Sequence, residues 1–422
     1  MDAEVITLFE DYWNSLPDFQ RHADDLNLLK KIVGKQNFSL QADGGIQIKH
    51  YVGFFQRGHT RIQILPKVFA PAVHGSFLTS EQTASLNFVH RLLEWSGYFQ
   101  YKPLPPQKIG RSNLDLLEIF INIFISEFDS LFRKKLHRQY QVQEEDSQFI
   151  KGKILFPETV RRHPILRHVH FLRTDQFTFN NPLNQIFKSV IVDLLGIART
   201  SECKKKLVLG LNYLQDVDLI PLTTRTFETI RFNRLNSEFE PLFKLAKMFF
   251  SNAQPSLEAG MENTFSFLIP LNDLFETLIG RTLESFSTQD RHYSYHQSHR
   301  YLARRGNVDV FQLKPDFVVT ECEHVVAVLD AKYKYPFGED GEVRVDTGDL
   351  YQIATYGMTY DCQYLFLIYP KFDGAPSANG VIARYDINSE MRMILWIIQV
   401  DILAHEKEVI SQQLKNAVES CF

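Results

Sequence analysis

The sequence predicts a multidomain chain: an α+β amino-terminal region, made of a small β meander plus helices, is followed by an α/β core with a mixed sheet flanked by helices. Three observations support this fold class. The chain has 422 residues, enough for two or three domains. Residues 38–65 alternate β-type segments with glycine-containing turns, and residues 271–400 alternate helical with strand-like patterns. We therefore expect domains at 1–110, 111–255 and 256–422.

Composition limits the classes of function. Hydrophobic residues make up 44% of the chain, which is enough for substantial buried cores, and the formal net charge of -4 provides no global basic field. Any nucleic-acid surface must therefore be local. The cysteines of the chain are widely separated and form no Cys-x-x-Cys pair, which argues against a zinc finger or a disulfide scaffold. The first residues lack the order of a signal peptide, and no apolar run of about 18 residues occurs, so we expect a cytoplasmic chain with no membrane contact.

The amino-terminal region, residues 1–110, combines one or two opening helices with strands predicted at 38–42, 46–55 and 60–65. The turns between them contain Asp43-Gly44-Gly45 and Gln56-Arg57-Gly58, so the strands are expected to form one meander. A helix is predicted over 86–98. Lys67, which follows Pro66, is either a functional contact or a solvated lysine at a strand end, and surface base rates favour the second.

The middle region, residues 111–255, is predicted to be mainly helical. Apolar residues at helical spacing indicate a long core helix over 113–138, and a second helix is expected over 185–199. Between them, residues 161–173 carry a cluster of arginines and histidines. This basic segment has two interpretations, a contact to a phosphate backbone or a charged surface between domains.

The carboxy-terminal region, residues 256–422, carries the patterns that indicate chemistry. Two short apolar strands, separated by a polar turn at 321–324, place Asp316 on the first and Asp330 with Lys332 on the second. Side chains alternate along a strand, so Asp330 and Lys332 share one face. The opposite face is also apolar, which predicts a central strand. Ionised groups are costly there unless they are paired, bind a metal or do chemistry.

Helices flank this hairpin in the sequence. Upstream, a helix beginning near Leu271 carries Glu276 at the margin of its apolar stripe. Downstream, Asp346 is expected to cap a helix in which Gln352 and Tyr356 stand one turn apart. Strands predicted at 364–369, 380–385 and 391–400, with a closing helix over 404–420, complete the core.

The pair Pro315-Asp316 and Asp330-Ala331-Lys332 resembles the motif of the PD-(D/E)xK nucleases, and the Gln-x-x-x-Tyr pair resembles the accessory motif of their RecB-like members. The resemblance implies a restriction-endonuclease-like core that binds Mg²⁺ as one or two ions, with Mn²⁺ as a substitute. Its carboxylates would be the metal ligands Asp316, Asp330 and Glu276. Lys332 would orient the attacking water and offset charge on the phosphate. The implied catalytic set is Asp316, Asp330, Lys332, Glu276, Gln352 and Tyr356.

A second basic segment, residues 291–305, contains four arginines, three histidines and no acid. The interleaved tyrosines can stack or pack while the arginines contact phosphates, so a mixed DNA-facing and packing role is expected. A zinc site made of His292, His296 and His299 is the alternative. The alternation of Tyr293 and Tyr295 favours a strand, which would not bring the three rings together.

Short motifs accompany these in order along the chain, namely residues 51–53 (YVG), 64–67 (ILPK), 151–154 (KGKI) and 181–184 (NPLN). With the nuclease motifs they make the chain resemble the McrC family, the nuclease subunit of McrBC modification-dependent restriction systems. The resemblance implies cleavage of double-stranded DNA together with a McrB-like AAA+ GTPase ring, whose GTP hydrolysis the amino-terminal part stimulates. The sequence contains no Gly-x-x-x-x-Gly-Lys-Ser/Thr loop, in agreement with a separate motor. A non-catalytic GTPase-activating adaptor and a stand-alone RecB-like DNA repair nuclease are the alternatives.

Overall fold

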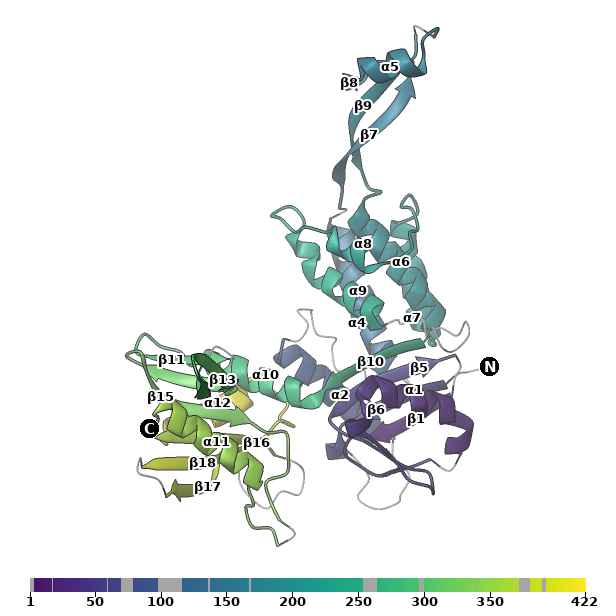
Figure 1. Ribbon diagram of the computed structural model, residues 1–422. Helices are drawn as coiled ribbons and strands as arrows, with labels where there is room; N and C mark the ends of the chain where they lie inside the picture. The colour runs from purple at the N-terminus through teal and green to yellow at the C-terminus, as the bar shows by residue number, and fades with distance from the viewer. Residues whose placement is uncertain are drawn as a thin grey trace. The chain divides into compact units, whose positions relative to one another are not determined.

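The structure is a computed structural model that describes residues 4–16, 18–58, 60–69, 79–97, 116–135, 137–166, 168–252, 264–295, 300–338, 340–371, 380–388 and 392–422. The chain forms two compact units (Figure 1). Unit 1 comprises Met1–Glu4, Gln56–His59 and Tyr101–Phe267, and unit 2 comprises Val5–Phe55, Thr60–Gln100 and Leu268–Phe422. The boundaries near residues 110 and 255 stay a prediction.

The amino-terminal strands of unit 2 form two sheets. One has the order β1-β6-β5-β10 and the other β2-β4-β3. Helix α1 lies between β2 and β3 in the sequence, and α2 follows β6. The bounds are β1 Glu4–Phe9, β2 Asn14–Ser15, α1 Ala23–Val33, β3 Phe38–Leu40, β4 Gly45–Ile48, β5 Tyr51–Arg57, β6 Thr60–Leu65, α2 Thr79–Trp95 and β10 Thr264–Pro270.

This arrangement corrects two expectations. The chain opens with strand β1, and the first α-helix begins only at Ala23. The strand expected over 46–55 is broken at His50, whose φ of 66° is left-handed, so β4 and β5 join different sheets. The hydrophobic pattern continues through the break, which is why periodicity alone predicted one strand and one meander.

Unit 1 contains a group of helices and a β-hairpin. Helix α4 carries a run of buried aromatic residues, and Phe128 stacks on Phe132 with ring centroids 4.0 Å apart. Asn181 caps α6 by accepting a hydrogen bond from the Asn184 N–H at 3.2 Å. The helices are α4 Leu116–Lys134, α6 Pro182–Ile197, α7 Ser201–Tyr213, α8 Thr224–Glu228 and α9 Glu240–Asn252.

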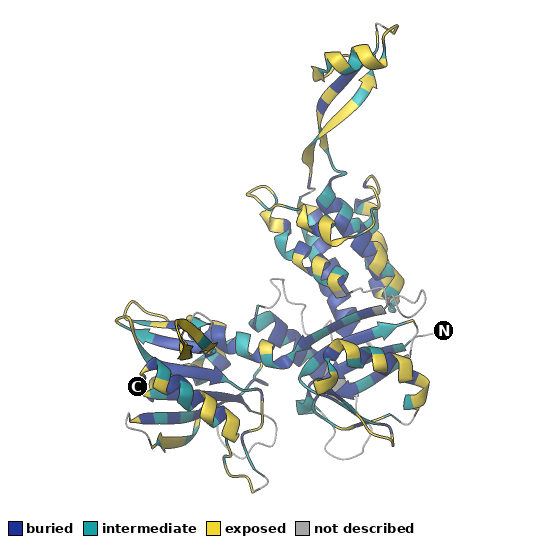
Figure 2. Cartoon of the chain, in the orientation of Figure 1, coloured by how far each residue is buried: buried dark blue, intermediate teal, exposed yellow. Residues whose placement is uncertain are grey.

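The hairpin of unit 1 pairs β7 Gln139–Ser147 with β9 His170–Thr178, and β8 Lys153–Ile154 and α5 Phe156–Arg162 lie at its tip. Figure 2 shows that exposed residues predominate along it. The basic segment 161–173 lies here, apart from Arg167, which is outside the described residues. Arg173 pairs with Glu144 at 2.6 Å, and His163 lies 2.7 Å from Asp146. The Arg173 ion pair and the His163–Asp146 hydrogen bond favour a charged surface over a phosphate contact.

The second half of unit 2 is built on a six-stranded mixed sheet with the order β11-β14-β15-β16-β18-β17. β15 pairs in parallel with β16, β16 pairs in parallel with β18, and the other neighbours are antiparallel. Its strands are β11 Arg291–Tyr295, β14 Phe317–Glu321, β15 His324–Ala331, β16 Tyr364–Pro370, β17 Gly380–Ile387 and β18 Met393–Val400. Its helices are α10 Leu271–Glu284, α11 Thr347–Tyr360 and α12 Lys407–Glu419. A separate ribbon pairs β12 Tyr301–Arg305 with β13 Val308–Gln312.

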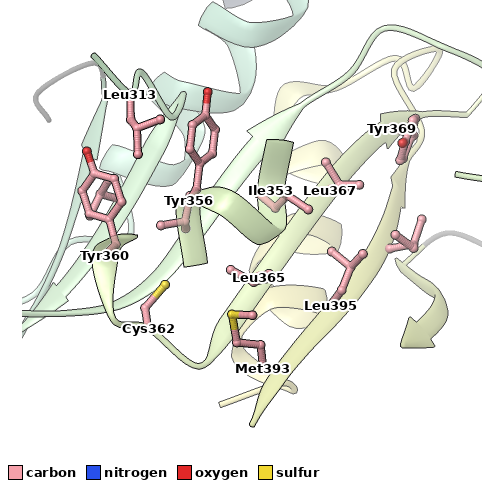
Figure 3. Close-up of a cluster of buried hydrophobic side chains, with 13 residues drawn as sticks. Leu313, Ile353, Tyr356, Tyr360, Cys362, Leu365, Leu367, Tyr369, Met393 and Leu395 are labelled. Carbon is pink, nitrogen blue, oxygen red and sulfur yellow. The ribbon is translucent and has the colours of Figure 1, made fainter. Parts of the chain in front are cut away.

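Helix α11 covers one face of this sheet. Figure 3 shows Ile353 and Tyr356 of the helix lying against Leu365 and Leu367 of β16. Gly357 lets the helix approach closely, because an added Cβ would lie 2.7 Å from the Met393 sulfur. Val328 of the buried strand β15 belongs to the same cluster, so packing under α11 also holds β15. None of the helices in the described part of the chain has both the length and the apolar character needed to cross a bilayer.

Candidate active site

Two neighbouring antiparallel strands bring Asp316 and Asp330 together. Asp316 directly precedes β14, and Phe317 is the register partner of Leu329, so the two aspartates face each other where the strands meet. The Ala331 N–H donates to Asp316 Oδ2 at 2.8 Å. Asp330 is 1% exposed. A carboxylate this deep in a sheet is retained at a cost in stability, which is typical of a functional site.

Lys332 provides the positive charge of the site. It follows the last residue of β15, and its N–H donates to the Ile368 carbonyl at 2.8 Å, which holds the backbone against β16. Its Nζ lies 2.6 Å from Asp330 Oδ2. Burial lowers the pKa of Lys332, but Asp330, through its charge and its hydrogen bond, together with Asp349 and Asp316 raises that pKa above its ordinary value. Lys332 therefore remains charged at neutral pH.

Helix α11 supplies the next residues. Asp346 caps it by accepting hydrogen bonds from the Gly348 and Asp349 N–H groups. Lys332 Nζ donates to Gln352 Oε1 at 2.9 Å, and Gln352 Nε2 donates to the Tyr356 hydroxyl at 2.8 Å. Tyr356 donates in turn to the Lys314 carbonyl, just before the Pro-Asp pair. The helix is thus linked by hydrogen bonds to both aspartate-bearing segments.

Glu276 approaches from α10. Burial, then Asp273 and Asp330, raises its pKa to about 7. Burial, then Asp330 and Glu276, raises the pKa of Asp316 to about 8. The pKa of Asp330 is also raised, chiefly by burial, although Lys332 opposes the shift. Asp330 thus raises the pKa of both Asp316 and Glu276, so the predicted carboxylates share one electrostatic site.

The sequence analysis did not identify two charged residues of the site, Asp349 and Lys334. Asp349 is 6% exposed and accepts from Lys334 Nζ at 3.0 Å, and Lys332 Nζ lies 3.8 Å from it. Asp349 stands three residues before Gln352 on the same helix, so helical spacing alone was enough to place it on that face. Lys334 continues the Asp-x-Lys alternation by one more step. The site therefore contains a second carboxylate–lysine ion pair, Asp349 with Lys334, beside the pair of Asp330 with Lys332.

The donor set can be compared with what Mg²⁺ requires. Three clustered carboxylates offer only hard oxygen ligands, and their repulsion would be relieved by a divalent cation. In the arrangement observed, no three His, Cys, Asp or Glu side chains of the described residues converge tightly enough to hold a metal ion. The Lys332 ammonium lies 2.6 Å from Asp330, the carboxylate between Asp316 and the lysine. The chemistry of the three carboxylates fits Mg²⁺.

An open cleft lies beside these residues. It has a volume of about 330 Å³. Gln352 and Tyr356 form the part of its wall that is hydrogen-bonded to the lysine. The other lining residues are Gln312, Leu313, Lys314, Tyr351 and Thr355. Exposed aromatic, amide and ammonium groups are the kinds of group that contact nucleic-acid strands.

The arginines of the second basic segment form contacts within the protein, and their DNA-facing role stays a prediction. Arg291 pairs with Glu321 and Arg304 pairs with Asp309, while Arg300 donates to the Thr359 carbonyl at 2.8 Å and stacks over Tyr360. Tyr293 is buried. His296 and His299 lie outside the described residues, so the zinc alternative stays untested. Three of its four arginines thus pair or pack within the protein, against the six-stranded sheet, the ribbon or α11.

Comparisons with known proteins identify the family. Residues 46–370, more than half of the chain, match the family described as McrBC 5-methylcytosine restriction system component. No curated protein matches the chain. Its fold is similar to that of a chain in the half-complex from the tetradecameric assembly of Thermococcus gammatolerans McrB AAA+ hexamers with bound McrC. The TM-score is 0.79 at 21% identity, covering 99% of this chain and 100% of that one.

A chain in the cryo-EM structure of the Thermococcus gammatolerans McrBC complex is also similar, with a TM-score of 0.52 at 23% identity, over 68% of this chain and 90% of that one. At these identities the two structures establish a shared fold. The family match, which spans both units, establishes the relationship. The chain belongs to the McrBC 5-methylcytosine restriction system component family.

Proposed function

We propose that this chain is the Mg²⁺-dependent endonuclease subunit of a McrBC-like restriction system, with its six-stranded sheet as a PD-(D/E)xK nuclease core. It cleaves phosphodiester bonds of double-stranded DNA in complex with a McrB-like AAA+ GTPase ring. One observation carries the proposal: Asp316 and Asp330 face each other across two paired strands, with Lys332 Nζ 2.6 Å from Asp330, and Asp330 raises the pKa of both Asp316 and Glu276. A purely structural hairpin gains nothing from this costly cluster.

Each residue has a role that follows from its position. Asp316, Asp330 and Glu276 would hold one or two Mg²⁺ ions, which supply an activated water and a counter-charge for the phosphate. Lys332, kept positively charged by Asp330, holds the water and offsets negative charge as it develops. Gln352 orients the Lys332 ammonium through its 2.9 Å hydrogen bond, and Tyr356 orients Gln352. The cleft lined by Tyr351 and Lys314 takes the neighbouring strand.

The partner assignment rests on the family and on an exposed apolar surface. The structurally similar assembly contains McrB AAA+ hexamers with bound McrC. In this chain, large apolar side chains are exposed on the β7–β9 hairpin, and an exposed apolar patch of this kind is typical of an interaction site. We define this hairpin patch as Tyr140, Val142, Phe149, Ile150, Phe156, Ile165 and Phe177. With the amino-terminal region, it is the surface we propose for the ring.

The test uses the full-length chain purified with a McrB-type partner. Cleavage of DNA containing 5-methylcytosine is measured with GTP, with and without Mg²⁺, against unmodified DNA and against each protein alone. We expect cleavage only when both proteins, GTP and Mg²⁺ are present, with Mn²⁺ able to replace Mg²⁺. GTP hydrolysis by this chain alone would contradict the division of labour.

The same assay separates the alternatives. A non-catalytic adaptor would raise the partner's GTP turnover but leave every DNA intact. A stand-alone RecB-like repair nuclease would cut DNA without the partner or GTP. The close packing of Asp330, Lys332 and Gln352 favours a working site over the adaptor. The size of unit 1, which lies outside the nuclease core, favours a partnered enzyme over the stand-alone nuclease.

A further inference from the structure

Next to the nuclease site, unit 2 contains a buried polar cluster that none of the roles above uses. It comprises Glu10 and Asp11 at the end of β1, and Lys67 just after β6. Glu10 is fully buried. Lys67 Nζ donates to Asp11 Oδ2 at 3.0 Å and lies 3.9 Å from Glu10 Oε1. Lys67 is thus not the solvated strand-end residue that surface base rates favoured, since 24% of its side chain is exposed and its ammonium is paired.

The ammonium of Lys67 also contacts the strand end that carries the nuclease lysine. Its Nζ lies 5.1 Å from the ring centroid of Tyr333, a cation–π distance. Tyr333 sits between Lys332 and Lys334 and is 3% exposed. Burial, and then Glu10 and Asp11, raises the pKa of Tyr333 well above its ordinary value, so the phenol stays neutral under the cation.

Tyr333 reaches a second part of the site as well. Its ring meets Phe275 edge to face with centroids 5.8 Å apart, and Phe275 precedes Glu276 on α10. The first residue of that helix is tied to the amino-terminal strands, because the Leu271 N–H donates to the His50 carbonyl at 2.7 Å. Through Tyr333, the segment that carries Lys332 therefore packs against the helix that carries Glu276.

We propose that Lys67 is a positioning residue of the nuclease: anchored by Glu10 and Asp11, it holds Tyr333 against Phe275 and so fixes where Lys332 and Glu276 stand. This inference rests on the proposed function for its catalytic consequence, but not for its structural one. It makes the β1–β6 region a structural part of the nuclease site in addition to its proposed role in partner contact.

The electrostatics of the cluster agree with an anchored lysine. Burial raises the pKa of Glu10 to about 7, while Lys67 opposes that shift. Removing the ammonium would leave a fully buried carboxyl without its cation, which would take up a proton or draw in water. Either response changes the packing beneath Tyr333. A misplacement of about 1 Å in a catalytic group costs roughly a hundredfold in rate.

The test compares Lys67→Met, which keeps the side-chain length, with the conservative Lys67→Arg. Lys35→Met removes the same charge from an exposed position in the same region. In the cleavage assay with partner and GTP, we expect Lys67→Met to lower kcat at least about tenfold with KM changed less than about twofold. Lys67→Arg should restore most of the rate, and Lys35→Met should match the unaltered chain. The partner's GTP turnover should be the same with all four proteins.

Hydrogen exchange supplies a readout that does not depend on cleavage. The Lys332 and Lys334 amides are hydrogen-bonded in the structure. In the full-length chain, we expect Lys67→Met to speed exchange of a peptide spanning 330–335 by about tenfold or more, with peptides of β18 unchanged. Unchanged exchange there, or a loss of kcat that Lys67→Arg does not restore, overturns the proposal. If the unaltered chain cleaves no DNA, the exchange result still decides the positioning role, and only the proposed function fails.

Discussion

Two regions of the molecule carry ion pairs of the same length in opposite surroundings. On the β7–β9 hairpin, Arg173 lies 2.6 Å from Glu144, and 49% and 39% of the two side chains are exposed. At the end of β15, Lys332 lies 2.6 Å from Asp330, with only 18% and 2% exposed. An exposed pair contributes about 0–1 kcal/mol to stability, whereas breaking a buried pair costs roughly 3–5 kcal/mol. Burial, and not the distance, distinguishes the exposed surface pair from the pair in the candidate active site.

The sharpest way to break this comparison is to neutralise one carboxylate in each setting. Asp330→Asn keeps the shape of the side chain but removes the charge that holds Lys332 and any Mg²⁺. We expect DNA cleavage by the partnered complex to fall at least about a thousandfold. The measurement is the rate of cleavage of 5-methylcytosine DNA under single-turnover conditions.

Glu240→Gln is the matched control for that change. Glu240 belongs to an exposed pair on α9, 3.0 Å from Lys244. Its loss should change stability by less than about 0.5 kcal/mol and leave cleavage unchanged. A thousandfold loss in the Glu240→Gln variant, or full activity in Asp330→Asn, would show that burial is not what distinguishes an exposed ion pair from the buried pair at the end of β15.

The second prediction concerns the apolar half of the hairpin. Phe149 and Ile165 of the hairpin patch are 82% and 87% exposed. Replacing both with serine should lower stimulation of the partner's GTP hydrolysis about tenfold, because exposed anchors contribute most of the energy of an interface. The thermal unfolding midpoint should not change. Leu235→Ser, at a residue that is 76% exposed elsewhere in unit 1, serves as the control and should keep full stimulation.

A third prediction tests how tightly α10 is held on the sheet. A Cβ at Gly280 would lie 2.9 Å from Phe317 Cε1 and 3.1 Å from the Tyr295 ring. Overpacking costs about 1–3 kcal/mol, while alanine gains about 1 kcal/mol of helix propensity, so Gly280→Ala should destabilise the protein by about 1 kcal/mol. A Cβ at Gly196 would meet no atom within 4 Å, so Gly196→Ala should instead stabilise the protein. Equal shifts in both variants, measured by chemical unfolding, would contradict this packing.

The smallest expected effect is the dependence of stability on pH. Asp316 has an ordinary pKa of 3.8 that rises to about 8 in the fold, and Glu276 goes from 4.5 to about 7. Between these values the folded state binds more protons than the unfolded state, so the free energy of unfolding falls as pH rises. Without metal, we expect the unfolding midpoint to drop by about 5 °C from pH ~5.5 to ~8.5. Asp316→Asn should flatten the slope, and a midpoint that rises with pH would contradict the shifts.

Local signals in the sequence were sufficient for much of the fold. Helix α11 begins where Asp346 predicted its cap, and the hairpin of β14 and β15 turns where the polar residues indicated. These elements are encoded by adjacent residues. The break at His50 was missed because a left-handed backbone leaves no trace in a hydrophobic pattern.

The candidate site shows the same division. The structure brings Asp316, Asp330, Lys332, Glu276, Gln352 and Tyr356 together as the motif spacing implied, while their catalytic roles remain predictions. The part that sequence reasoning did not find is non-local. Lys67 and Tyr333 are separated by more than half of the chain, and only tertiary packing brings them into contact. The kind of side chain predicted what chemistry each residue could do, but not which distant residues would contact it in the fold.

The interleaving of the two units has a consequence for synthesis. The chain leaves unit 2 after Gln100 and returns to it at Leu268. Apart from the short stretches at 1–4 and 56–59, unit 1 is therefore an insertion within unit 2. At about 5–20 residues per second, the ribosome needs on the order of ten seconds or more to make that insertion. During this interval the first strands of unit 2 exist without the sheet that completes them. The candidate nuclease site is thus assembled only after nearly the whole protein has been translated, and we expect a truncated product to carry no cutting activity.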